Sequence, residues 1–257
     1  MLIGISGKKN TGKDEVGSII QYLTTKIIHS YSYQDFINVD ILSINETLGS
    51  SWKIKKYAAK LKQIVSILLN IPVHMLERED VKNRVLGPQW DRYKLRYEYM
   101  NVKNFERTIY FANEKDMMKH IETETLKNRI RVLEGGLTKI TIRILLQEIG
   151  TQAMRNMIHP DIWVNSLFEG YEPKCDKYII TDVRFLNEAQ AIKDRDGIII
   201  RLERETNTDD QHESEIALDD HYNMFNHVVD NNGNINDLVE KIRIILSEHN
   251  LIKSRFV

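Results

Sequence analysis

The chain has 257 residues, with 36 basic and 37 acidic side chains and a formal net charge of −1 at pH 7. This balance argues against a protein whose main partner is nucleic acid or an anionic membrane, so anion recognition is expected to be local. The single cysteine, Cys175, cannot form an internal disulfide, and no Cys/His zinc spacing is present, which favours a reducing compartment.

The N-terminal apolar run, MLIGIS, is too short for a signal peptide or a membrane span, so we expect a cytoplasmic protein without membrane association. The length suits one α/β domain carrying an elaboration. Composition leaves a homodimer open.

The first elements are expected to be a buried strand and a helix. Residues 2–6 form a short apolar run that ends at Gly7, which is typical of a strand in a parallel sheet. A helix is predicted after Gly12, because apolar residues recur at helical spacing: Val16, Ile19, Ile20, Leu23, Ile27 and Ile28.

The turn between these elements has the pattern G-x-x-x-x-G-K, from Gly7 to Lys13. Glycines let successive amides point inward around phosphate oxygens, and the helix start adds its positive end. We expect the intervening Lys8, Asn10 and Thr11 to help form this cradle, and Lys13 to reach the β and γ phosphates of a nucleotide. The alternative is an ordinary strand-to-helix turn with an exposed lysine.

Asp14 stands where such loops normally carry a serine or threonine that binds magnesium. A carboxylate is also a hard oxygen ligand, so Asp14 can hold Mg²⁺ directly or through a water molecule. The alternative, which applies to Glu15 as well, is an acid that stabilises the positive end of the helix.

The middle of the chain reads as helices around a less regular lobe. A helix is predicted over residues 54–69, ended by Pro72, and another over 138–157. Residues 77–135 are charged and rich in tyrosine, so we interpret them as an inserted helical or irregular lobe for substrate binding or closure. Within this lobe a helix is expected near residues 117–129, and RYKLRYEYM at 92–100 is expected to form a packed or lid helix.

One stripe of the 138–157 helix is polar and is expected to face a cleft; it carries Arg143, Gln147, Gly150, Thr151 and Met154. Arg143 can offer a bidentate fork to a monophosphate, which a lysine does less specifically. Gln147 could read a base edge. In the next helix, Trp163 could stack on a base, although an apolar helix more often buries its tryptophan in a core. Solvated side chains on a helix face are the alternative for the two polar residues.

The C-terminal part predicts strands alternating with helices, with strands at 178–182, 198–202 and 227–229. This order argues for a mainly parallel sheet covered on both faces. Asp182 ends the first of these strands, at the edge where ligands of such sheets bind, and could hold magnesium-bound water or a substrate hydroxyl. Arg184 and Glu188 follow closely enough to share that rim. A helix-capping Asp182 beside a surface arginine is the alternative.

Two further groups of charged or titratable residues lie near the C-terminal strands in sequence. Arg201 and Arg204 could close over the γ-phosphate as a lid, or could be surface charges at a strand end. His212 beside Glu213 and Glu215 resembles a metal cluster, but the H-x-x-E pair His212 and Glu215 alone lacks a third ligand, so a polar loop is favoured over a metal site.

Several stretches together resemble the bacteriophage deoxynucleoside monophosphate kinases. The most specific is the loop ending in Gly-Lys-Asp, because that family commonly carries aspartate at this position. The others are YAAKLKQIVSILLNI at 57–71, LEREDVK at 76–82, RILLQEIGTQAMRNMIHPDIWVN at 143–165, ITDVRFLNEAQAI at 180–192 and HESE at 212–215. The resemblance covers almost the whole chain.

The resemblance implies a P-loop NTPase fold of three layers and an ATP- and Mg²⁺-dependent kinase that converts deoxynucleoside monophosphates to diphosphates. It implies that Gly7, Gly12, Lys13 and Asp14 hold the ATP phosphates and Mg²⁺. Residues around the monophosphate would be Arg143, Gln147, Gly150, Thr151 and Trp163, with Asp182, Arg184 and Glu188 as a second substrate-side group. Lys13, Asp14, Arg143, Asp182 and Arg184 are thus the candidate catalytic residues.

This chain departs from the pattern at Glu15, where relatives tend to have threonine, and the tyrosine-rich stretch at 88–115 has no counterpart that we recognise. Two other functions stay open. One is phosphorylation of another nucleotide-like molecule such as dephospho-coenzyme A, and the other is nucleotide binding without catalysis. If the chain is phage-encoded, the host cytoplasm is its expected location.

Overall fold

The structure is a computed structural model that describes residues 1–25, 32–38, 51–102, 105–205 and 216–252. The chain forms two compact units. Unit 1 comprises residues 1–60 and 158–257, and unit 2 comprises residues 61–157, so unit 2 is a continuous insertion into unit 1. The predicted lobe at 77–135 lies within unit 2, which also includes the helices on either side of it.

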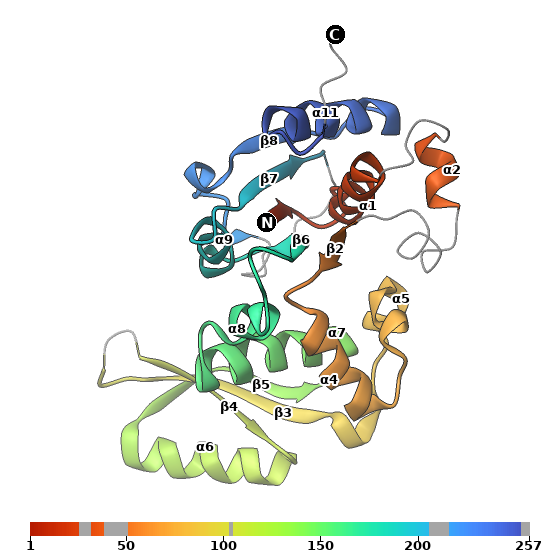
Figure 1. Ribbon diagram of the computed structural model, residues 1–257. Helices are drawn as coiled ribbons and strands as arrows, with labels where there is room; N and C mark the ends of the chain where they lie inside the picture. Colours follow the sequence, from red (N-terminus) through yellow and green to blue (C-terminus); the bar gives the residue numbers. More distant parts are fainter. Residues whose placement is uncertain (26–31, 39–50, 103–104, 206–215, 253–257) are drawn as a thin grey trace. The chain divides into compact units, whose positions relative to one another are not determined.

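Unit 1 is built on a five-stranded parallel sheet in the order β2-β6-β1-β7-β8 (Figure 1). The strands are β1 (Leu2–Gly7), β2 (Trp52–Lys55), β6 (Lys177–Val183), β7 (Ile198–Glu203) and β8 (His227–Asp230). Every residue of β1 is buried, which is why its sequence is a continuous apolar run. Ile3 of β1 aligns with Ile179 of β6 and Ile198 of β7.

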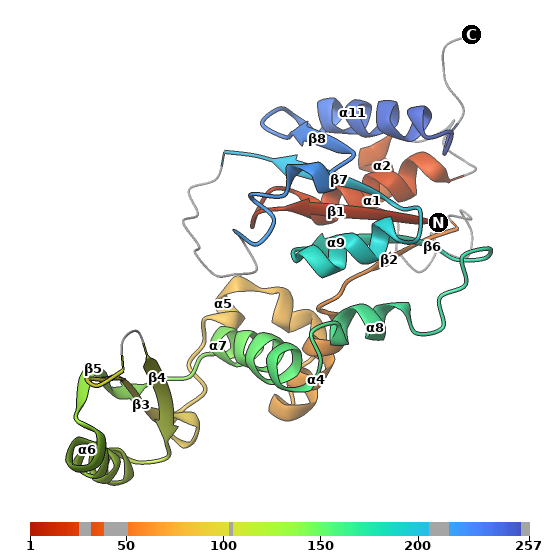
Figure 2. The same cartoon turned by 90° about the vertical axis from the view of Figure 1, so that its left-hand side faces the viewer.

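Helices cover both faces of this sheet, because side chains alternate along a strand. Ile3 and Ile5 pack with residues of α1 (Lys13–Thr24), α2 (Tyr33–Ile37) and α11 (Ile235–Glu248). Gly4, which points the other way, faces Ile192 of α9 (Leu186–Lys193). Figures 1 and 2 show α9 on the face opposite α1 and α11. Unit 1 also contains α8 (Ile162–Phe168) and the 3₁₀ turn η5 (Tyr222–Met224). The result is the three-layer α/β arrangement that the sequence predicted.

Unit 2 contains a helical part and a small antiparallel sheet. The helical part comprises most of α4 (Ala59–Leu69), the 3₁₀ turn η2 (Val73–Glu77), α5 (Glu79–Lys82), α7 (Ile142–Gln147) and the π-helical turns η4 (Glu148–Ile158). Its core holds Val65, Leu76, Val81 and Ile142. The common core of α4 and α7 explains why unit 2 extends beyond the predicted lobe.

The sheet of unit 2 has the strand order β4-β3-β5. After the 3₁₀ turn η3 (Pro88–Trp90), the elements are β3 (Arg92–Tyr99), β4 (Glu106–Phe111), α6 (Glu114–Asn128) and β5 (Ile130–Thr138). Leu95 and Tyr97 of β3 and Met117 of α6 form a common core, and Figure 1 shows α6 running lengthwise beside the sheet.

Three expectations about the middle of the chain were wrong. The helix predicted over 54–69 begins at Ala59, because Trp52–Lys55 pairs with β6 as strand β2. RYKLRYEYM is the central strand β3 and not a helix, so the lobe is neither purely helical nor irregular. The helix predicted over 138–157 begins at Ile142, since β5 runs to Thr138. In each case pairing with a distant strand outweighed the local pattern.

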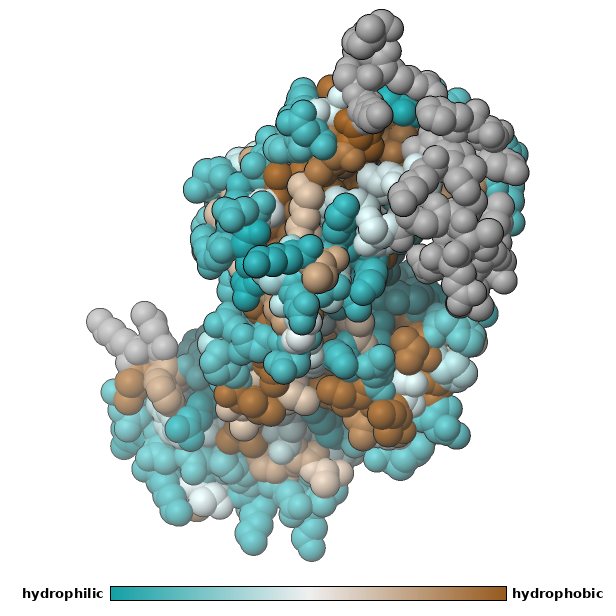
Figure 3. All heavy atoms as spheres, in the orientation of Figure 1, coloured by the Kyte–Doolittle hydropathy of each residue, from teal (hydrophilic) through white to brown (hydrophobic). Residues whose placement is uncertain are grey.

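The other predicted elements are confirmed within a few residues, including the helix near 117–129. Ile27, Ile28 and the 212–215 stretch lie outside the described residues. No helix in the described ranges has the length and apolar character needed to cross a membrane. Figure 3 shows mainly hydrophilic residues on the visible surface, with apolar residues in separate patches.

Candidate active site

The loop from Gly7 to Lys13 follows β1 and leads into α1, as predicted. Gly7 has φ 153° and Gly12 has φ 92°, backbone conformations that favour glycine. Space also requires glycine, because a Cβ on Gly7 would lie 2.8 Å from the Leu202 carbonyl oxygen, and one on Gly12 would lie 2.8 Å from Nδ2 of Asn231. Asn10 is left-handed as well, with φ 64°. The two glycines of the motif are therefore structural requirements of this turn.

Two contacts hold the loop in shape. The Thr11 side chain donates to the Lys8 carbonyl at 2.9 Å. Asn231, which follows β8, donates from its buried Nδ2 to the Thr11 carbonyl at 2.8 Å. Loop residues Lys8, Asn10 and Thr11 thus define the curve of the chain.

Lys13 lies at the first turn of α1 and its side chain folds back over the loop. Its Nζ donates to the carbonyls of Gly7 at 2.6 Å and Lys8 at 2.5 Å. Burial lowers the pKa of Lys13 to about 7, and the nearby charge of Arg184 acts in the same direction. Asp14 opposes this shift. The half-buried ammonium group therefore lies in an electropositive setting that a bound anion would relieve.

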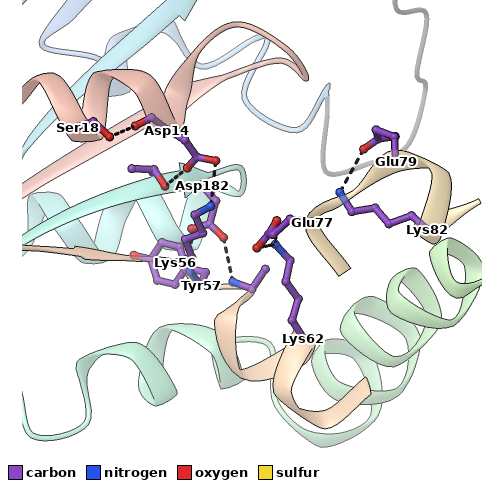
Figure 4. A network of polar contacts seen from close by, with 11 residues as sticks. Asp14, Ser18, Lys56, Tyr57, Lys62, Glu77, Glu79, Lys82 and Asp182 are labelled. Carbon is purple, nitrogen blue, oxygen red and sulfur yellow. Dashed lines mark hydrogen bonds and ion pairs between the residues drawn. The ribbon is translucent and has the colours of Figure 1, made fainter. Parts of the chain in front are cut away.

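Asp14 is on the exposed side of the first turn of α1, and both of its carboxylate oxygens have partners (Figure 4). Oδ1 accepts a hydrogen bond from the hydroxyl of Thr181 on β6 at 2.7 Å. Oδ2 forms an ion pair with Nζ of Lys56, which follows β2, at 2.9 Å. The carboxylate is thus held by two strands of the sheet.

Glu15, the residue that departs from the family pattern, points toward α2. Its Oε1 accepts a hydrogen bond from the hydroxyl of Tyr33 at 2.8 Å. Burial raises the pKa of Tyr33, and this hydrogen bond raises it further. Glu15 therefore has a structural partner on another helix.

Asp182 lies near the carboxyl end of β6, and it binds backbone amides. Oδ1 accepts from the Tyr57 amide at 2.7 Å and Oδ2 from the Ala58 amide at 2.9 Å (Figure 4). These amides precede α4, so Asp182 caps the chain between β2 and α4. The capping interpretation of Asp182 thus has direct geometric support, although the cap is on a different helix from the one expected.

Glu188 is 2% exposed. Its Oε2 accepts from the backbone amides of Arg184 at 2.8 Å and Phe185 at 3.1 Å, the two residues that immediately precede α9. The backbone carbonyl of Glu188 accepts from the Tyr57 hydroxyl at 3.0 Å. Glu188 thereby fixes the turn that carries Arg184, whose charge acts on Lys13.

The predicted monophosphate residues of unit 2 lie along α7 and the turns that follow it. The Arg143 guanidinium is engaged by its own unit, with Nε donating to Asn83 at 3.0 Å and Nη2 to Glu79 at 2.5 Å. Glu79 also pairs with Lys82 at 3.1 Å (Figure 4). Gln147 is half-buried.

Gly150 and Thr151 are buried. A Cβ on Gly150 would lie 2.8 Å from the end of the Leu61 side chain, so Gly150 packs closely against α4. Trp163, in unit 1, is 5% exposed. A base could stack on its ring only after neighbouring side chains move, and this role stays a prediction.

Arg201 differs from its predicted lid role. It is on β7, 5% exposed, and donates to Oγ of Ser6 at 3.1 Å and to Asp219 at 2.7 Å. Asp219 also pairs with Lys8 of the loop at 2.9 Å. The lid prediction for Arg201 was wrong because this residue supports the loop from within the sheet. Arg204 is exposed, and its lid role stays a prediction.

Sequence reasoning missed Lys56, Thr181, Asn231 and Asp219. Each contacts the loop or Asp14 from a distant part of the chain, and none was singled out, although Thr181 lies within the ITDVRFLNEAQAI stretch. Only the position of Thr181, next to Asp182 at a strand end, offered a signal.

The residues present suit a magnesium ion bound together with a nucleotide. Asp14 offers an exposed carboxylate beside Lys13, and oxygen donors are what Mg²⁺ prefers. The described part of the chain contains no group of three or more His, Cys, Asp or Glu that could hold a metal. Mg²⁺ is usually bound through one or two carboxylates together with water and substrate phosphates.

Comparison with known families places these observations in context. A family model described as deoxynucleotide monophosphate kinase matches residues 1–242. The comparison with curated proteins finds no match. The family match extends over both units and includes every residue of the loop described above.

Proposed function

The chain belongs to the deoxynucleotide monophosphate kinase family, and from this premise we propose that it transfers the γ-phosphoryl group of ATP to a deoxynucleoside monophosphate in the presence of Mg²⁺. The observation that carries the proposal is the placement of Lys13 and Asp14 at the end of a glycine loop that opens α1. Donor, metal and acceptor residues are the parts of this proposal that go beyond the family.

Unit 1 is proposed to hold the donor. The loop amides and the positive end of α1 would bind the ATP phosphates, and Lys13 would exchange its contacts with the Gly7 and Lys8 carbonyls for phosphate oxygens. Arg184 adds positive charge beside Lys13. Together these groups would stabilise the negative charge that the γ-phosphoryl group carries during transfer.

Asp14 would hold the magnesium ion, directly or through water. The ion would supply charge neutralisation across the β and γ phosphates. Thr181 is proposed to orient the carboxylate through its hydrogen bond to Oδ1. Asp182, with its two backbone hydrogen bonds, is better suited to holding the chain next to Lys56 than to accepting protons.

Unit 2 is proposed to recognise the acceptor. Arg143 can bind a monophosphate by two parallel hydrogen bonds, for which the phosphate would have to displace Glu79. Gln147 lies one turn further along the same helical segment. The attacking phosphate oxygen carries no proton in most molecules at neutral pH, since the second pKa of a phosphate monoester is about 6. No general base is therefore needed.

Proposed partners are small molecules only, and the near-zero net charge gives no support for nucleic-acid binding. The cytoplasm, where ATP and nucleotide pools meet, is the proposed location, which is the host cytoplasm if the chain is phage-encoded.

A coupled assay with ATP, Mg²⁺ and each of the four common deoxynucleoside monophosphates tests the proposal. The expected result is diphosphate formation from at least one of them. Dephospho-coenzyme A and the ribonucleoside monophosphates complete the panel. Turnover of dephospho-coenzyme A alone would reject the acceptor, and ATP binding without transfer to any compound would reject catalysis.

A further inference from the structure

Lys56 forms an ion pair with Asp14, the carboxylate to which the proposed function assigns the metal. Its ammonium group lies 2.9 Å from Oδ2 of Asp14, while Oδ1 accepts from Thr181. Lys56 follows β2, and the ion pair joins residues that are 42 positions apart in the chain (Figure 4). The side chain of Lys56 is 25% exposed, so the pair is partly shielded from water on the lysine side.

The two partners of Asp14 are not equivalent toward a cation. Thr181 is a neutral hydroxyl that can turn its own lone pair toward a cation. An ammonium group, in contrast, carries three donors, no acceptor and a full positive charge. Lys56 and a divalent ion therefore repel each other and compete for the same oxygen.

The backbone next to Lys56 is anchored, whereas the Lys56 side chain can change its rotamer. The amides of Tyr57 and Ala58 are bound by Asp182, so the backbone after Lys56 is anchored to β6. Lysine has a flexible four-carbon stem. Rotation of the side chain can therefore carry the ammonium group away from Asp14 without movement of the backbone. Lys56 lies at the edge of the sheet where the loop and Lys13 also lie, since the strands are parallel.

We propose that Lys56 is an exchangeable counterion of Asp14: it competes with the divalent ion in the nucleotide-free protein, and it moves to phosphate oxygens of the metal-bound nucleotide once the ion takes its place. This makes Lys56 a further phosphate-binding residue. The inference rests on the proposed function in taking Asp14 as the metal ligand. It has a thermodynamic consequence, which is that binding of metal and of nucleotide support each other.

Binding of Mn²⁺ to the nucleotide-free full-length protein, measured by the electron paramagnetic resonance signal of free Mn²⁺, tests the first half. Lys56→Met should bind Mn²⁺ more tightly than the wild type, by about threefold or more, because an ion pair of this exposure and its repulsion of the metal are both removed. Lys56→Arg keeps the charge and should bind as weakly as the wild type.

Lys53→Met is the matched control. Lys53 lies on β2, three residues before Lys56, and its substitution also removes a lysine–aspartate pair, with Asp176 at 3.2 Å, but leaves Asp14 untouched. Its Mn²⁺ affinity should equal that of the wild type. Asp14→Asn should lose Mn²⁺ binding in both the wild-type and the Lys56→Met background.

Calorimetric binding of ATP tests the second half. At a Mg²⁺ concentration that already saturates Asp14, so that Lys56 is displaced before the nucleotide binds, Lys56→Met should weaken ATP binding several-fold. It should have little effect when EDTA removes the metal, because Lys56 then stays on Asp14. An unchanged Mn²⁺ affinity, or an unchanged affinity for MgATP, overturns the proposal. Neither measurement involves turnover, so a wild-type protein that fails the acceptor panel would reject the kinase function and leave the result on Lys56 to be judged separately.

Discussion

Binding of ATP is expected to be coupled to proton uptake by Lys13. In the nucleotide-free protein, burial and the charge of Arg184 lower the pKa of Lys13 to about 7. Phosphate oxygens favour the charged form, so the complex should return the pKa toward the ordinary value for lysine, about 10.4. Between these two values the protein must take up a proton to bind ATP.

The size of the effect follows from the shift. With a pKa of about 7, about nine in ten Lys13 side chains are neutral at pH 8. Binding at pH 8 should therefore take up about 0.9 proton. Charging the lysine costs about 1.4 kcal/mol of binding free energy at pH 8 and about 2.7 kcal/mol at pH 9, so the Kd for ATP should rise about tenfold between these pH values.

Isothermal titration calorimetry measures the proton directly, when MgATP is titrated at pH 8 in buffers of different ionisation enthalpy. The slope of the observed enthalpy against ionisation enthalpy is the number of protons taken up. Lys13→Met is the reference, since it keeps the apolar stem and should show weaker binding with no uptake assigned to this residue. Equal proton uptake by the two proteins, or a wild-type Kd that is constant from pH 7 to 9, would refute the reasoning.

Three predictions concern stability and are checked by thermal or urea unfolding. Gly12→Ala should lower the free energy of unfolding by about 1–3 kcal/mol, through strain at φ 92° and the clash with Asn231; an unchanged Tm would contradict the assigned strain. Glu188→Ala should cost about 1–3 kcal/mol, because the two amides just before α9 lose their acceptor, and Glu188→Gln should recover part of it; a loss of turnover at unchanged stability would instead assign Glu188 to substrate. Nε2 of His227 lies 2.8 Å from Nε2 of His249. Burial lowers the pKa of His227, and the charge of His249 lowers it further. The unfolded chain therefore takes up this proton at a higher pH than the folded chain does, so the free energy of unfolding should fall as the pH drops below about 6.5. His227→Gln should flatten this slope, and an equally steep slope in the variant would rule out this histidine as its cause.

The sequence was sufficient to predict the loop and the strand and helix on either side of it, because local chemistry determines these elements. A continuous apolar run predicts a strand buried on both faces, and two glycines with left-handed or crowded positions mark the turn that follows. The βαβ unit from Lys177 to Glu203 was recognised for the same reason.

Where pairing between distant segments decides the structure, the sequence was not sufficient. The spacing of apolar residues from Ile54 onward suits a helix, and only pairing with β6 makes Trp52–Lys55 a strand. Leu95 and Tyr97 alternate with Arg96 and Glu98, a strand signal that the basic and aromatic character of the segment obscured. Both cases are tertiary effects on segments of ambiguous propensity.

Side-chain partners within the site were beyond local reasoning as well. Lys56, which follows β2, contacts Asp14 in the first turn of α1. Asn231, which follows β8, contacts Thr11 in the loop. Neither residue type at its position announces this contact. The motif predicts which residues are candidates for phosphate binding, and the fold determines which residues hold them in place.

The most direct test of the account is transfer of labelled phosphate from γ-labelled ATP to deoxynucleoside monophosphates by the wild type and by Lys13→Met, with Mg²⁺ at pH 7.5. The account predicts labelled deoxynucleoside diphosphate with the wild type, and loss of at least about 99% of the rate with a variant whose circular dichroism and unfolding are those of a folded protein. Near-normal transfer by folded Lys13→Met would contradict the assignment of this loop as the phosphate site.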